Sequence, residues 1–282
     1  MRIGANTWIW TSPFGTDNLD LVHKVKSLGF DVIEVAVEDL ALIDAAALKG
    51  ALQETGLEPA LCGAFGPERD IGSDDPARRE TGLHYIRDCL ALAEYLGATR
   101  FAGPVNAAVG DTRPRPPDEI ERRRAHVVEN LRALGHEASE RGVVICLEPL
   151  NRFETDMVNT AEQAVALVEQ VGSPNVQIHL DTFHMNVEEK HLPAAIRRAG
   201  GRLQHFHACG SDRGIVGADH TDWAGIRDAL RDIGYDGLVV IESFTPGVKE
   251  IARAAAIWRP LAPTQDALAA DSLRYLRELF AS

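Results

Sequence analysis

Residues 138–148 read ASERGVVICLE, and this stretch carries the pattern that decides the fold. Gly142 follows a segment in which apolar residues recur at helical spacing. A glycine just past a helix adopts the left-handed conformation that ends the helix at little cost. The apolar run Val143–Leu147 shows no alternation, as is typical of a strand covered on both faces. The stretch therefore predicts a helix, a tight turn and a buried strand that ends at Glu148.

The same succession recurs along the whole chain. Seven times a helical stretch ends at a glycine and an apolar run follows, the glycines being Gly29, Gly56, Gly97, Gly142, Gly172, Gly200 and Gly234. The apolar runs are Val32–Val37, Pro59–Cys62, Arg100–Ala102, Val143–Leu147, Val176–Leu180, Leu203–His207 and Leu238–Ile241. With the N-terminal run Arg2–Thr7 they make eight expected strands.

Strands that alternate strictly with helices form right-handed crossovers and a parallel sheet. Eight such units most simply close into a (β/α)8 TIM barrel, which is an α/β fold. An open doubly wound sheet is the alternative, but it usually carries a glycine-rich phosphate turn after its first strand, which this sequence lacks. Length alone would allow two domains, yet no low-complexity linker interrupts the series. We therefore expect one barrel domain, residues 1–282.

Composition argues against several classes of protein. The chain of 282 residues has 29 Lys and Arg against 42 Asp and Glu, and its net charge of −13 opposes binding to the phosphates of nucleic acids. It has no run of 18 apolar residues and no signal-peptide pattern at its start, so neither a membrane span nor secretion is expected. Four widely separated cysteines are expected to be reduced thiols in a cytoplasmic protein. The run Arg122–Arg124 is expected on a solvated helix face.

The later strands end in residues that can bind a metal. Glu148, Asp181, His207 and Glu242 stand at the ends of the fifth to eighth strands, with separations of 33, 26 and 35 residues. In such barrels the chemistry comes from the C-terminal ends of the strands, so these side chains should meet at one mouth. Each alone could be a helix cap or an ion-pair partner. Three carboxylates gathered together repel one another unless a cation is bound, so the set predicts a site for Mn²⁺, Mg²⁺ or Co²⁺, with Zn²⁺ as an alternative.

Other polar residues follow the same strands. Glu154, His184 and Arg213 could hydrogen-bond a polyol or could be solvated loop residues. Two further histidines, His179 and His205, share the side-chain parity of Asp181 and His207 one layer lower, and we interpret them as buried, hydrogen-bonded structural residues. The aromatic residues at the end of the first strand are expected in the core or in a pocket wall, namely Trp8, Trp10 and Phe14.

Two segments, Cys146–Glu154 and Leu180–Asn186, closely resemble the ketose 3-epimerases of the D-tagatose/D-psicose (allulose) 3-epimerase family, which are xylose isomerase-like barrels. The resemblance extends over essentially the whole chain. It implies that Glu148, Asp181, His207 and Glu242 bind the metal, that Glu148 and Glu242 are the acid/base pair, and that Glu154, His184 and Arg213 hold the substrate's C1–C3 oxygens. This sequence departs from many members at the pocket's far wall, in Gly103–Gly110 with Asn106, and at Asn6.

The resemblance implies metal-dependent epimerisation of free ketoses at C3, of the D-tagatose, D-psicose or L-ribulose type. Removal of the C3 proton next to the C2 carbonyl gives an enediolate, and inversion needs a base on one face and an acid on the other. The expected metal is Mn²⁺, with Co²⁺ or Mg²⁺ as alternatives, and the expected assembly is a homo-oligomer, a dimer or a tetramer. Alternative functions are an aldose–ketose or inosose-type isomerase, an AP-endonuclease-like phosphodiesterase and a non-catalytic sugar-binding barrel.

Overall fold

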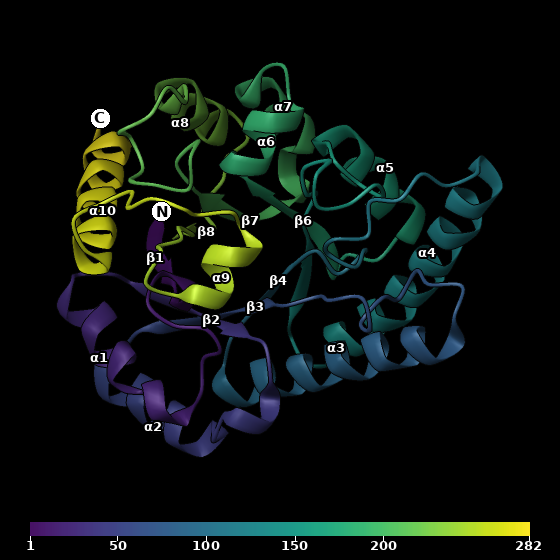
Figure 1. Cartoon of the computed structure of the whole chain (residues 1–282), viewed down its shortest axis with the longest axis horizontal. Helices are drawn as coiled ribbons and strands as arrows, with labels where there is room; N and C mark the ends of the chain where they lie inside the picture. Colours follow the sequence, from purple (N-terminus) through teal and green to yellow (C-terminus); the bar gives the residue numbers. More distant parts are fainter.

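Eight parallel strands close into a barrel in the order β1 to β8, as the computed structural model of residues 1–282 shows (Figure 1). The strands are β1 Arg2–Asn6, β2 Val32–Val37, β3 Glu58–Gly63, β4 Arg100–Gly103, β5 Val144–Leu147, β6 Val176–Asp181, β7 Leu203–Ala208 and β8 Leu238–Ile241. Each lies within a residue or two of the run that predicted it. The barrel closes because β1 pairs with both β2 and β8. The predicted TIM barrel is therefore confirmed, and the open sheet is excluded.

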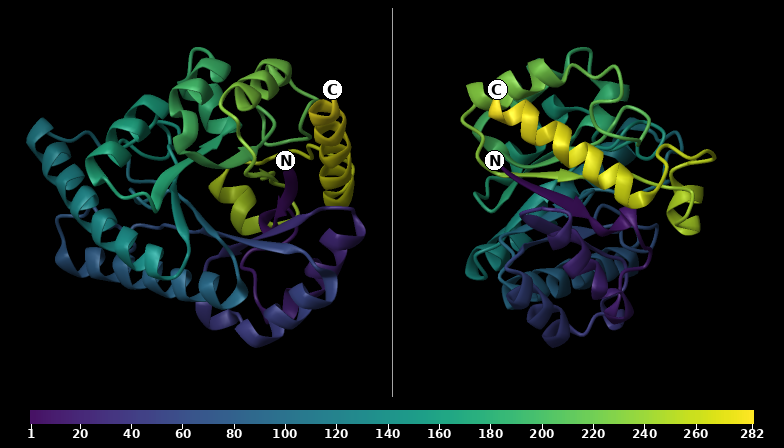
Figure 2. Two further views of the ribbon diagram at one scale, coloured as in Figure 1. Left: turned by 180° about the vertical axis from the view of Figure 1, so that it is seen from behind. Right: turned by 90° about the vertical axis from the view of Figure 1, so that its left-hand side faces the viewer.

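Helices surround the barrel as an outer ring (Figure 2). They are α1 Asp20–Ser27, α2 Ala45–Thr55, α3 Pro76–Leu96, α4 Pro117–Glu140, α5 Ala161–Val171, α6 Thr182–Glu188, α7 Leu192–Ala199, α8 Trp223–Asp232, α9 Lys249–Ala254 and α10 Gln265–Ala281. The last helix, α10, packs against β1 and β8, so the C-terminal part of the chain covers its first strand.

Local sequence accounts for where these helices begin and end. Helix α3 begins after Asp75, whose side chain accepts a hydrogen bond from the Ala77 amide, and Pro76 occupies its first turn. It ends at Gly97, which has a φ of 82°. A side chain is strained in that left-handed conformation, so glycine ends the helix at little cost.

The barrel interior is built in layers of different polarity. Its lower layer is a small apolar cluster of Val32, Ala60, Leu238 and Val240, separate from the main core. Gly4 makes room for this layer, because a Cβ atom there would lie 2.8 Å from Cβ of Val32. The layer above it is polar and fully buried, and consists of Glu34, His179 and His205, with the ring of His207 in contact with Glu34 from the next layer. The register between β6 and β7 pairs His179 with His205 and Asp181 with His207.

One surface expectation was wrong. Arg122 is half exposed and pairs with Asp74 at 2.8 Å, but Arg123 is buried and its Nη2 lies 2.7 Å from Asp70 Oδ2. Asp70 lies in the loop after β3, and its carboxylate offsets the free-energy cost of burying this guanidinium. The four cysteines are free thiols, as expected. None of the helices combines the length and the apolar composition that a membrane crossing requires.

Candidate active site

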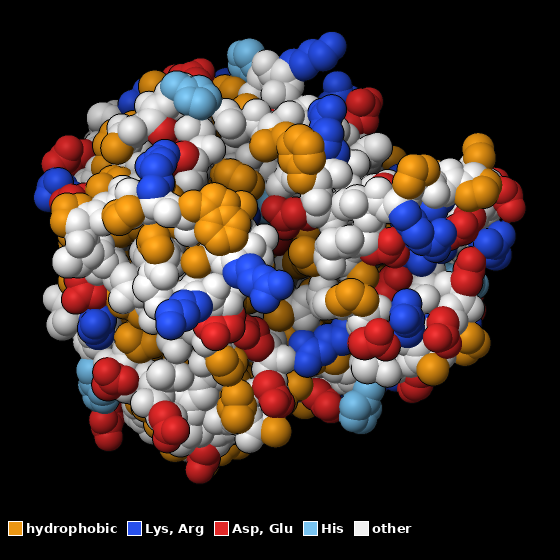
Figure 3. Space-filling model, viewed as in Figure 1, with side chains coloured by type: hydrophobic (Ala, Val, Ile, Leu, Met, Phe, Trp, Pro, Cys, Tyr) orange, Lys and Arg blue, Asp and Glu red, His pale blue; other side chains and the backbone are white.

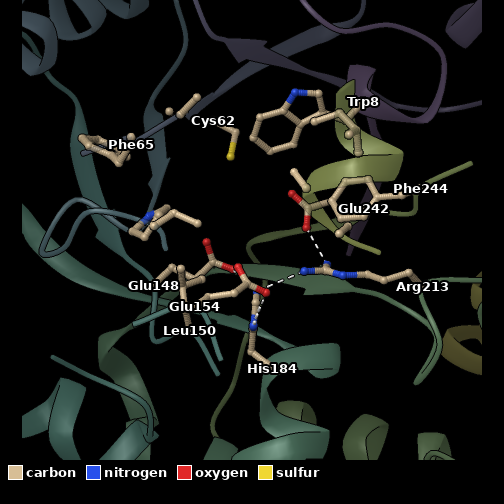
Figure 4. A pocket seen from close by; sticks show the side chains of 18 residues that line it. Trp8, Cys62, Phe65, Glu148, Leu150, Glu154, His184, Arg213, Glu242 and Phe244 are labelled. Atoms are coloured by element: carbon tan, nitrogen blue, oxygen red, sulfur yellow. Dashed lines mark hydrogen bonds and ion pairs between the residues drawn. The ribbon is translucent and has the colours of Figure 1, made fainter. Parts of the chain in front are cut away.

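A cavity of about 260 Å³ opens at the C-terminal ends of the strands. Figure 3 shows this face hollowed near its centre, where acidic and hydrophobic side chains meet. The polar side chains that line the cavity are Glu148, Glu154, His184 and Arg213 together with Glu242 (Figure 4). Its apolar lining includes Trp8, Phe65, Val109, Leu150, Phe244 and Ile251. Part of the wall comes from α9, which Figure 1 shows in front of the strands.

The structure brings the four predicted metal ligands together at the base of this cavity, where Glu148 and Glu242 line it. Asp181 is the last residue of β6, His207 lies near the end of β7, and Glu148 and Glu242 directly follow β5 and β8. Ligand atoms of Glu148, Asp181 and His207 all lie within 4.8 Å of one another. Nδ1 of His207 lies 3.5 Å from Glu242 Oε1 and 4.0 Å from Asp181 Oδ2.

The donor set suits a divalent cation. Nδ1 of His207 is buried and has no hydrogen-bond partner, although it faces two carboxylates. A buried nitrogen without a partner is unfavourable, and a metal ion bound there would satisfy it. Three carboxylates and one imidazole form an oxygen-rich set typical of Mn²⁺, Mg²⁺ or Co²⁺ sites rather than thiolate-rich structural zinc sites.

The carboxyl groups of the site differ in their electrostatics. Burial raises the pKa of Glu148 well above its usual value, and the nearby charge of Glu242 raises it further. Burial also raises the pKa of Asp181, to about 6. Burial acts on Glu242 in the same direction, but His207 and Arg213 outweigh it, so the pKa of Glu242 is lowered. Without a shared cation, the two glutamates therefore differ in their tendency to hold a proton.

Arg213 is a buried part of the site and not a solvated loop residue. Its Nη1 lies 2.9 Å from Asp181 Oδ2 and 2.7 Å from Glu242 Oε2, and Figure 4 shows the contact with Glu242. The guanidinium carbon stands 4.0 Å from the ring centroid of Phe183, a cation–π contact. Arg213 also has a φ of 66°, which is strained for a residue other than glycine. Such strain persists only where surrounding contacts impose it, as they do here.

His184 and Glu154 lie on the opposite wall of the cavity from Glu242 (Figure 4). The backbone N–H of Asn151 donates to Nδ1 of His184 at 3.1 Å. Nε2 of the same histidine lies 3.1 Å from Nη2 of Arg213. Oε1 of Glu154 accepts a hydrogen bond of 2.8 Å from the Asn151 side chain. These contacts hold both side chains in the cavity wall, where they can meet the oxygens of a small polar ligand.

Sequence reasoning missed Glu34, which is buried inside the barrel. Its Oε2 lies 2.7 Å from both Nε2 of His207 and Nδ2 of Asn6, and its Oε1 lies 2.7 Å from Nε2 of His205. Burial opposes its charge, but His207 and His205 hold the pKa of Glu34 below its usual value. The signal was present in the sequence, because an acidic residue in the buried run Val32–Val37 is rarely found without a partner.

The other residues singled out in the sequence lie partly in the barrel interior and partly at the cavity wall. His179 and His205 are buried as expected, but the expected hydrogen bonds are missing, because no nitrogen of either ring has a hydrogen-bond partner. Nδ1 of His179 lies 3.6 Å from Glu148 Oε2, and Nε2 of His205 makes only the ion-pair contact with Glu34. Trp8 lines the cavity, whereas Trp10 donates to Asp266 on α10 at 2.7 Å. Asn106 is buried without a hydrogen-bond partner and is not part of the cavity lining.

The chain is similar to known proteins over nearly its whole length. The family model described as xylose isomerase-like TIM barrel matches residues 22–279. A ketose 3-epimerase from Arthrobacter globiformis is 33% identical over 99% of this chain and 96% of its own length. An L-ribulose 3-epimerase from Mesorhizobium japonicum is 33% identical over 98% of this chain and 93% of its own. The crystal structure of D-allulose 3-epimerase from Methylomonas sp. in complex with D-allulose has a TM-score of 0.93 at 30% identity, covering 99% of this chain and 96% of that chain.

Proposed function

Because the chain belongs to the ketose 3-epimerase family of xylose isomerase-like TIM barrels, we propose that this isomerase epimerises free ketoses at C3. The proposal rests on the placement of Glu148 and Glu242, which belong both to the cavity wall and to the candidate metal site. Both carboxylates line the cavity, and both also belong to the group of candidate ligands around His207. A substrate that reaches the metal site therefore lies between two groups able to exchange a proton with it.

The two glutamates perform the acid/base chemistry. Both carboxylates reach the cavity from different strand ends, β5 and β8, so one can act as base while the other acts as acid. One glutamate removes the C3 proton from one face of the ketose, and the other delivers a proton to the opposite face. In the reverse direction the roles exchange, as general acid/base catalysis requires.

Asp181 and His207 complete the ligand set with the two glutamates, and Mn²⁺ is the preferred ion. When bound, a divalent cation supplies Lewis acidity at the C2 oxygen and offsets the repulsion that raises the Glu148 pKa. Glu154, His184 and Arg213 bind the oxygens near C1–C3. The more apolar part of the cavity, around Phe65 and Ile251, receives the rest of the sugar.

Free sugars fit this cavity better than sugar phosphates. Arg213 is the one cationic side chain in the lining, and two carboxylates already contact it. A phosphate group would therefore find no unpaired cation, although recognition of phosphate depends on one.

The test is a substrate panel with Mn²⁺-loaded wild-type protein. Free ketopentoses and ketohexoses, their phosphates and the matching aldoses are each incubated, and products are identified by NMR. We expect each accepted ketose to give its C3 epimer without aldose. Formation of aldoses from ketoses would favour the aldose–ketose isomerase, and a preference for phosphates would contradict the free-sugar assignment.

A further inference from the structure

Glu34 stands in the middle of β2, one layer below the candidate metal ligands. It is fully buried, and its carboxylate contacts residues of two other strands, Asn6 of β1 with His205 and His207 of β7. The layer beneath it is apolar throughout. A charged side chain at such a position is costly to bury, and hydrophobic residues of similar volume can usually replace buried ion pairs without loss of stability. Folding alone therefore does not explain a carboxylate at this place.

The contact with His207 determines which ring nitrogen faces the metal site. Oε2 of Glu34 lies 2.7 Å from Nε2 of His207, while Nδ1 of the same ring lies 3.5 Å from Glu242 and 4.0 Å from Asp181. A carboxylate at Nε2 requires the proton on that nitrogen, because Glu34 can only accept. In the neutral ring, which is the form that binds a metal, Nδ1 then carries the lone pair, and it faces Glu242 and Asp181.

We infer that Glu34 is a positioning residue of the metal site, which accepts the Nε2 proton of His207 and so fixes the ring with Nδ1 as the ligand. The inference rests on the metal site of the proposed function. Asn6 holds Glu34 in turn, since its Nδ2 donates to the same Oε2 at 2.7 Å. A carboxylate behind a ligating histidine fixes its tautomer and raises its basicity as a ligand.

The competing interpretation is a second metal ion bound by His179, His205 and His207. Nitrogens of His179, His205 and His207 also lie within 4.8 Å of one another. Nε2 of His207 cannot bind such an ion while it donates its proton to Glu34. The two interpretations therefore predict different numbers of bound ions.

The experiment compares Mn²⁺ affinity in metal-stripped wild-type protein, Glu34→Gln and Asp70→Asn, measured by isothermal titration calorimetry. Asp70 is the matched control, because it is also a buried carboxylate, but it pairs with Arg123 outside the cavity. We expect Glu34→Gln to bind Mn²⁺ about tenfold more weakly, as for other partners of metal-bound histidines. Asp70→Asn should lower the melting temperature and leave the dissociation constant unchanged. Equal affinities in wild type and Glu34→Gln would overturn the inference.

A second measurement needs no variant. In Zn²⁺-loaded wild-type protein, ¹⁵N NMR of His207 should show a protonated Nε2 and a metal-bound Nδ1, with one ion bound per chain. Metal on Nε2, or two ions per chain, would overturn the inference. Both measurements are independent of any sugar, so failure of the proposed epimerase activity would be seen separately, in the substrate panel.

Discussion

Arg213 links two candidate metal ligands through one guanidinium nitrogen. Its positive charge lowers the pKa values of both Asp181 and Glu242, against the effect of their burial. Replacing it by Gln should therefore raise both pKa values and move the acid limb of the kcat/KM profile to higher pH, by about one unit. Arg213→Lys keeps the charge and should shift the limb less. The measurement is the pH dependence of ketose epimerisation, and an unchanged acid limb in Arg213→Gln would contradict the electrostatic role.

Single residues differ in how far sequence reasoning could predict them. The residues at strand ends were predictable, because the fold directs every strand end to one mouth. Glu34 was not found by that rule, since it lies in the middle of a strand and its partner His207 is 173 positions away. Arg123 was misassigned for a related reason. Its neighbours on the helix suggest a solvated face, but the loop that carries Asp70 covers it.

At the level of elements, the loop after β7 positions Arg213. The backbone N–H of Arg213 donates to the carbonyl of Gly210 at 2.8 Å, and a Cβ atom on Gly210 would lie 3.0 Å from the carbonyl oxygen of Gly214. Gly210→Ala should therefore displace the loop and its guanidinium by a few tenths of an ångström, and lower kcat/KM by about tenfold.

The control is Gly50→Ala in α2, where an added Cβ meets nothing within 4 Å. That variant should keep full activity and gain about 0.5–1 kcal/mol in the free energy of unfolding. Steady-state kinetics and urea unfolding of both variants provide the measurements. Wild-type kcat/KM in Gly210→Ala would show that the loop tolerates the side chain.

Some helices and strands could be predicted from the sequence and others could not. All eight strands were predictable, since seven of them follow a helix-ending glycine and all eight are short, mainly apolar runs that must be buried. Helix α9 was not, because its six residues are too few to show a helical period, yet it forms part of the cavity wall through Ile251 and Ala254. The positions of the candidate ligands could thus be predicted from regular elements, whereas the shape of the cavity depends on short connecting segments.

For the whole molecule, bound metal should stabilise the fold. A hundredfold excess of Mn²⁺ over its dissociation constant contributes about 2.7 kcal/mol, which raises the melting temperature by about 5 °C. EDTA should remove this gain and the activity together. Differential scanning calorimetry before and after chelation measures the shift. Full activity in protein shown to be free of metal would contradict the metal site.

The same gain should depend on pH in a defined direction. Burial raises the pKa of Asp181 to about 6 from 3.8, so the metal-free folded state binds more protons than the unfolded state between these values. Protonation of Asp181 therefore increases the free energy of unfolding of the metal-free protein as pH falls from about 6 toward 3.8. Metal binding needs the carboxylate, so Mn²⁺ affinity should fall below pH 6 by up to about tenfold per unit. Melting curves with and without Mn²⁺ should converge toward pH 4.

The route that the substrate hydrogen takes distinguishes C3 epimerisation from aldose–ketose isomerisation by hydride shift. If Glu148 and Glu242 exchange the C3 proton with solvent, product formed in D₂O carries deuterium at C3 and none at C1. Glu242→Gln should stop product formation more severely than metal binding, because an amide oxygen can coordinate a metal but cannot take up the C3 proton. A hydride-shift isomerase on the same scaffold would move hydrogen directly between C1 and C2. NMR of the product resolves the two positions, and unlabelled C3 would rule out the two-glutamate mechanism.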